Sequence, residues 1–122
     1  MEKSFSLSPD ITSLLLGEGN QTMRTTPLDI LVGLLVHLFR QIFHDFDVPS
    51  VHIEHHGREP CDGADDIDLT QTIGWFTTTY PVHIPVTSST TLNEAIRLVK
   101  DNRYLIPKNG EPYFAFRQLS TN

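Results

Sequence analysis

The strongest constraint on the fold is a long apolar segment that begins at Thr26. The sequence TPLD at 26–29 offers a cap hydroxyl, a proline in the first turn, and a carboxylate at the third helical position that can bond back to the cap. Apolar residues then recur at helical spacing as far as Ile42, and further apolar residues fill the other faces. We therefore expect a helix that is buried nearly all round and supplies most of the core.

Two shorter segments flank this helix on its amino-terminal side. Ser8 and Pro9 form a typical helix start, and Gly17 is a typical stop, so a short helix is predicted between them. Residues 18–25 are polar and contain Gly19 and Asn20, and a linking turn or irregular segment is expected there.

The segment 51–56 has the alternation of a strand. Two faces are expected, one largely apolar and the other carrying a carboxylate between two imidazoles. The first face would hold Val51, Ile53 and His55, and the second His52, Glu54 and His56.

A second strand is predicted within 73–86, which is rich in β-branched and aromatic residues. Pro81 and Pro85 fall on the same face and cannot donate to a ladder, so this strand is expected at a sheet edge. The intervening segment 60–68 carries four aspartates and Gly63, and a surface loop is expected there.

The carboxy-terminal third is predicted to hold a helix and a tail. The capping-box pattern of Thr91 and Glu94 starts a helix that should end near Asn102. PKNG at 107–110 is typical of a turn. Three aromatic residues, Tyr113, Phe114 and Phe116, suggest a final strand or a buried tail. The whole order predicts an α/β unit with helices packed on a small mixed sheet.

Composition limits the possible function classes. The 122 residues are enough for one domain, and the formal charge of −6 gives no basic footprint for nucleic acid. Cys61 is the only cysteine, which excludes an intrachain disulfide and fits a cytoplasmic protein. The amino-terminal residues lack the apolar core of a secretory signal, and no apolar run is long enough to cross a bilayer.

Four stretches in one order resemble the epimerization domains of nonribosomal peptide synthetases. EHHGRE at 54–59 is similar to the family motif EGHGRE, and DIDLTQTIGWFTTTYPV at 66–82 is similar to TVGWFT-x-x-YPV. MRTTPLDILVGLL at 23–35 and AIRLVKDNRYLIPKNGEPYFAFRQL at 95–119 resemble two further helical parts of such domains. The sequences of the four stretches are most similar to those of the fungal synthetases.

The resemblance implies a fold and a position within it. Domains of the condensation and epimerization superfamily consist of two chloramphenicol-acetyltransferase-like lobes with the active site between them. Residues 1–122 would form a single partial domain, most of the carboxy-terminal lobe. The HHxxxDG motif belongs to the other lobe and does not occur in this sequence. Five residues separate His56 from Asp62, where the family motif has three, and His55 and His56 lie within the EGHGRE match, so they are not that motif.

The resemblance also implies a reaction and its residues. The family inverts the α-carbon of an aminoacyl or peptidyl thioester carried on the 4′-phosphopantetheine of a carrier domain, with no cofactor bound directly. Glu54 would be one acid/base partner, and a histidine of the missing lobe the other. His56, Gly57 and Arg58 would shape the cleft and orient Glu54, and Trp75 and Tyr80 would form its walls. The chain alone is therefore expected to be inactive.

Other interpretations of these residues remain open. Glu54 could be an exposed strand residue paired with Arg58 or His56, and the two aromatic residues could belong to the core. His55 stands where the family has glycine, and its ring could alter the following turn. A metal on His52, Glu54 and His56 is disfavoured because alternate residues of one strand converge poorly on an ion.

The class of the whole chain also has an alternative. A remnant or docking module would bind a carrier protein or a synthetase lobe without catalysis. A piece of a two-lobed domain is also expected to expose apolar surface and a strand edge that the other lobe would cover, which favours self-association.

Overall fold

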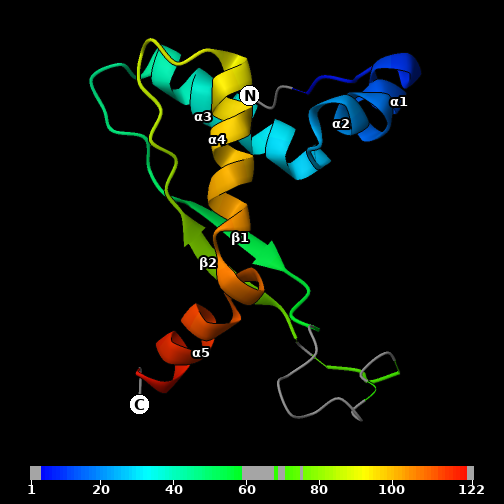
Figure 1. Cartoon of the computed structure of the whole chain (residues 1–122), viewed down its shortest axis with the longest axis vertical. Helices are drawn as coiled ribbons and strands as arrows, with labels where there is room; N and C mark the ends of the chain where they lie inside the picture. Colours follow the sequence, from blue (N-terminus) through cyan, green and yellow to red (C-terminus); the bar gives the residue numbers. More distant parts are fainter. Residues whose placement is uncertain (1–3, 59–67, 69–70, 75, 121–122) are drawn as a thin grey trace. The chain divides into compact units, whose positions relative to one another are not determined.

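The computed structural model describes residues 4–58, 68, 71–74 and 76–120. Its elements, in chain order, are α1 (Pro9–Leu16), α2 (Glu18–Met23), α3 (Pro27–Ile42), β1 (Val51–His55), β2 (Thr78–Val82), α4 (Leu92–Tyr104), the short 3-10 helix η1 (Pro107–Gly110) and α5 (Glu111–Leu119) (Figure 1). They form two compact units, Met1–Val48 with Pro85–Lys100 and Pro49–Ile84 with Asp101–Asn122.

Helix α3 begins as its sequence predicts. The backbone N–H and the hydroxyl of Thr26 donate to the Asp29 carboxylate at 2.7 and 2.8 Å, and the Asp29 N–H donates to the Thr26 hydroxyl at 3.3 Å. Asp29 has no exposed surface. A buried carboxylate is tolerated here because the unsatisfied donors of the helix start surround it.

The prediction that α3 is buried nearly all round is wrong. Its buried side faces α4: a Cβ added at Gly33 would lie 2.8 Å from the Cα of Ile96, so the two helices approach closely at a residue without a side chain. On another side, apolar residues recur at steps of three and four and are 37% to 64% exposed. This leucine seam consists of Leu28, Leu31, Leu35, Leu38 and Ile42. Nothing in the described part of the chain covers it, because α4 packs on one side of the helix only.

Helices α1 and α2 follow each other closely. The Ile11 N–H donates to the Ser8 hydroxyl at 3.4 Å, and Gly17 ends α1, as predicted. The expected linking turn at 18–25 is instead mostly helical. The side-chain amide of Asn20 donates to the Leu15 carbonyl, and the Thr25 hydroxyl donates to the Asn20 side-chain oxygen at 3.4 Å. These contacts stabilise a helical turn that its residue propensities disfavour.

Helix α4 starts with the predicted capping box. The Thr91 N–H donates to the Glu94 carboxylate at 2.8 Å, and the Glu94 N–H donates back to the Thr91 hydroxyl at 3.3 Å. Ala95, Ile96 and Val99 are buried on one face of the helix, whereas Leu92, expected on the same face from its spacing, is 37% exposed.

Strands β1 and β2 form an antiparallel pair (Figure 1). The pairing places Ile53 opposite Tyr80 and Glu54 opposite Thr79. Among the described residues of the predicted segment 73–86, the strand covers Thr78–Val82, and Ile73 is 99% exposed. Val82 and Ile84 are buried and His83 is exposed, so the alternation of a strand continues past the end of β2. The predicted loop at 60–68 lies outside the described residues apart from Asp68.

The tail after α4 is neither a strand nor buried. Lys108, Asn109 and Gly110 all have left-handed backbone, with φ of 47°, 46° and 79°. The chain then continues as α5, with a proline in its first turn. Phe116 is 73% exposed, so the aromatic run 113–116 lies on a helix and not in the core.

Candidate functional site

Strand β1 carries the candidate acid/base residue on its open face. Ile53 is 4% exposed and faces the core, whereas His52 and Glu54 are exposed, as the alternation predicts. No hydrogen bond or ion pair joins the Glu54 carboxylate to any residue that the structure describes, so the alternative pairing with Arg58 or His56 is not present. The carboxylate is open to a ligand or a partner.

The HGR turn, defined as His56, Gly57 and Arg58, follows the strand. The Arg58 N–H donates to Nδ1 of His56 at 3.0 Å, which requires that nitrogen to be unprotonated. Gly57 has φ of +60°, a conformation that side-chain-bearing residues rarely adopt. Its Cα also faces Phe76: a Cβ there would lie 2.7 Å from the Phe76 carbonyl carbon. Residue 57 is therefore required to be glycine for two reasons: its backbone is left-handed, and a side chain would clash with the Phe76 carbonyl.

Arg58 lies over an aromatic ring. Its guanidinium carbon is 4.8 Å from the centroid of the Phe76 ring, within the range of a cation–π interaction. Phe76 lies between Trp75 and the start of β2 in the sequence, and sequence reasoning missed it. It lies within the GWFT match, where the tryptophan is the residue that the resemblance implies as a cleft wall.

His55 fits the strand despite replacing a family glycine. It pairs with Thr78 in the ladder and does not have a positive φ. Its ring lies 4.0 Å from the ring of His56, centroid to centroid, at an interplanar angle of 41°. The expected disturbance of the turn is absent at this position, because Gly57 and not His55 takes the left-handed backbone.

Tyr80 is part of the core. It is 2% exposed, and its Cβ lies 2.5 Å from where a Cβ of Gly110 would stand. The Thr78 hydroxyl donates to the Asn109 carbonyl at 3.4 Å in the same region. Burial favours the packing role for Tyr80. Trp75, the other predicted wall residue, lies outside the described residues.

His52 and Glu54 share the open face of β1, whereas His56 follows the strand with its ring 4.0 Å from the ring of His55. Across the ranges that the structure describes, no three histidine, cysteine or acidic side chains are grouped as metal ligands. The open face of β1 instead presents Glu54 as its one carboxylate, a group that can accept or donate a proton.

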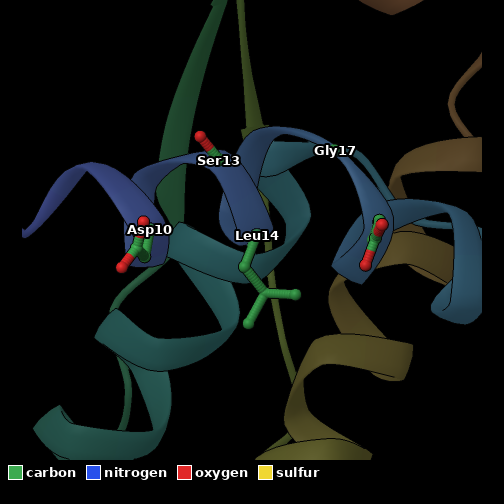
Figure 2. A pocket seen from close by; sticks show the side chains of 5 residues that line it. Asp10, Ser13, Leu14 and Gly17 are labelled. Carbon is green, nitrogen blue, oxygen red and sulfur yellow. The ribbon is translucent and has the colours of Figure 1, made fainter.

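A separate hollow of 480 Å³ lies where α1 meets α2, lined by Asp10, Ser13, Leu14, Gly17 and Glu18. Figure 2 shows the side chains of Asp10, Ser13 and Leu14 carried by α1. Asp10 and Glu18 are exposed carboxylates, and nothing in the sequence pointed to this hollow.

None of the described helices has the length and apolarity to span a bilayer.

Comparison with solved structures defines the class of the fold. The crystal structure of the epimerization domain from the third module of tyrocidine synthetase B superposes with a TM-score of 0.77 at 33% identity. The match covers 97% of this chain and 26% of that one. The fold is thus that of part of an epimerization or condensation domain, and the predicted fold class is confirmed.

Sequence comparison gives the more particular relationship. The chain is 48% identical over 122 residues to nonribosomal peptide synthetase 4 of Gibberella zeae, and 45% identical over 120 residues to nonribosomal peptide synthetase ungA of Aspergillus violaceofuscus. Each match covers 98% of this chain. The chain is therefore related to the fungal nonribosomal peptide synthetases over nearly its whole length, which confirms the recognition made from the motifs.

The extent of the match limits what the relatives say. The chain spans 1% to 2% of the length of these curated relatives. No protein-family model matches it. The similarity supports a segment of a condensation-superfamily domain, and not a whole synthetase.

Proposed function

We propose that the chain forms one side of the cleft of an epimerization-type domain, as a single partial domain from the carboxy-terminal lobe. The observation that carries the proposal is the exposed Glu54 carboxylate, which pairs with none of the described residues and lies on the open face of β1, two residues before the HGR turn. The substrate would be an aminoacyl or peptidyl thioester on the 4′-phosphopantetheine of a carrier domain. A cytoplasmic location is part of the proposal.

Inversion at the α-carbon needs two groups on opposite faces. A base removes the Cα proton, the electron pair moves into the thioester carbonyl to give an enolate, and an acid returns a proton to the other face. Glu54 is proposed as one of these groups, and a histidine from an HHxxxDG-bearing lobe as the other. His56, Gly57 and Arg58 shape the approach to Glu54, whereas Tyr80 supports the strand from the core. Trp75 is retained as a proposed wall of the cleft.

The leucine seam supports the need for a second body. Five apolar side chains that are more than a third exposed form a surface that a soluble domain normally covers. The proposal names the remainder of the two-lobed domain as that body. In its absence, seam-to-seam association of two copies is expected.

Sedimentation velocity tests the association directly. The wild-type chain should sediment faster as concentration rises, and Leu35→Glu, which places a charge in the middle of the seam, should remain a monomer. A wild-type chain that stays monomeric at high concentration would remove this part of the proposal.

The catalytic proposal is tested by reconstitution. The chain is mixed in D₂O with a separately produced lobe that carries HHxxxDG and with an aminoacyl-loaded carrier protein, and deuterium at Cα is measured by mass spectrometry. Glu54→Gln should reduce exchange by about 100-fold or more, the usual contribution of general acid–base catalysis. The matched control is His52→Gln, an exposed residue on the same face, which should retain wild-type exchange.

Two outcomes would overturn or redirect the proposal. Equal exchange in wild type and Glu54→Gln would remove Glu54 from catalysis. No exchange in the wild-type mixture would contradict the catalytic proposal as a whole. The second candidate is a non-catalytic docking module, motivated by the lack of the HHxxxDG motif in this sequence. It predicts that a carrier protein with an intact pantetheine arm is still retained by the immobilised chain.

A further inference from the structure

Phe76 contacts the HGR turn in two independent ways. In the ladder, His55 pairs with Thr78, and continuing the same register places Gly57 opposite Phe76. The Phe76 carbonyl group fills the space where a side chain of residue 57 would be. The Phe76 ring meanwhile lies under the guanidinium of Arg58 at 4.8 Å. One residue therefore contacts both the backbone of the turn and its cationic side chain.

These contacts restrict different degrees of freedom. The carbonyl restricts the path of the backbone at Gly57, and the hydrogen bond from the Arg58 N–H to the His56 ring closes the turn behind it. An exposed arginine otherwise samples many rotamers, and ordering it has an entropic cost at the moment of binding. A ring under the guanidinium reduces that cost in advance, because the cation is attracted to the face of the ring.

The geometry points to Phe76 as a positioning residue that holds the HGR turn and presents the Arg58 guanidinium in one orientation. The functional part of this inference rests on the proposed function, in which Arg58 lines the approach of the carrier-bound substrate to Glu54. Phe76 itself touches neither the reacting atoms nor Glu54 in this scheme. Its loss should weaken substrate binding and leave the chemical step unchanged.

The first arm of the test uses the full chain alone and needs no activity. NMR of the wild type should show the Arg58 side-chain protons shifted upfield by the ring, relative to other arginines. Phe76→Leu keeps an apolar side chain but removes the ring, so these signals should move to ordinary arginine positions. Phe76→Tyr keeps the ring face and should restore the shift. Backbone amide signals of β1 and β2 report whether each variant is folded.

A reciprocal variant keeps this arm decisive if Phe76→Leu does not fold. Arg58→Gln removes the cation and leaves the ring in place, and the ring signals of Phe76 should then shift. Arginine signals that are unchanged in a folded Phe76→Leu variant, or ring signals that are unchanged in Arg58→Gln, would overturn the inference.

The second arm uses the reconstituted domain. Phe76→Leu should raise the KM for the loaded carrier by about 2- to 5-fold, the factor that corresponds to an exposed cation–π interaction, with kcat unchanged. Phe76→Tyr should restore the KM. A fall in kcat at constant KM would contradict the binding role. If the wild type shows no exchange at all, the proposed function fails, while the NMR arm still decides the positioning role.

Discussion

Replacing Gly57 with alanine should destabilise the unit that contains β1 and β2, for two reasons that act together. Residue 57 has φ of +60°, and a left-handed conformation costs a non-glycine residue about 1–2 kcal/mol. The new Cβ would also lie 2.7 Å from the Phe76 carbonyl carbon, whereas ordinary contacts begin at 3.4 Å. The segment 76–78 must therefore retreat, and overpacking of this kind costs about 1–3 kcal/mol.

The reduced entropy of the unfolded chain offsets part of this cost, by about 0.4–1 kcal/mol for a glycine to alanine change. The net loss in the free energy of unfolding should be about 3 kcal/mol, roughly a 100-fold change in the folding equilibrium. Urea denaturation followed by circular dichroism measures it, provided that the slope of the transition is unchanged.

Two further variants separate the causes. Asparagine adopts left-handed backbone more readily than alanine but still carries a Cβ. If the contact of that Cβ with the Phe76 carbonyl is costly, Gly57→Asn should be more stable than Gly57→Ala by about 1 kcal/mol at most. The matched control is Gly74→Ala, where the new Cβ meets the end of the Phe76 ring at 3.0 Å and φ is not positive. That ring can move, and the change should stay within about 0.5 kcal/mol of the wild type. A Gly57→Ala chain as stable as Gly74→Ala would refute the reasoning.

Three other predictions concern the rest of the fold. Gly110→Ala, with φ of 79° and Tyr80 Cβ 2.5 Å from the added carbon, should lower the unfolding free energy by about 2–4 kcal/mol in the same urea assay. Val36→Ala, at a side chain 1% exposed, should cost about 2 kcal/mol, whereas Leu38→Ala, 46% exposed, should cost under about 1 kcal/mol; equal losses would contradict the observed burial. Hydrogen bonds from the Thr91 backbone and hydroxyl hold the pKa of Glu94 below its ordinary value. The stabilisation from Glu94 is therefore present above the unfolded-state pKa and lost as pH falls through the folded-state pKa. The difference in stability between wild type and Glu94→Gln should be constant near neutral pH and shrink in acid, and a difference that grows in acid would contradict this sign.

Local chemistry was sufficient for the starts of the helices and for the faces of the first strand. The capping boxes at Thr26 and Thr91 depend only on groups three residues apart, so the sequence predicts these helix starts without knowledge of the tertiary structure. The exposure of Glu54 and the burial of Ile53 depend on a period of two along one strand. The motifs around Glu54 likewise pointed to the correct family without any knowledge of the packing.

Contacts between distant residues decided the remainder. Tyr80 is buried because Gly110, thirty positions later, leaves room for its ring. The apolar residues of α3 indicate that the leucine seam could be buried. The tertiary structure shows that α4 packs on a different side of the helix and leaves the seam exposed. The contact of Phe76 with Gly57 and Arg58 arises from the register of two strands, and register is set by how the strands pair, which neither segment specifies alone.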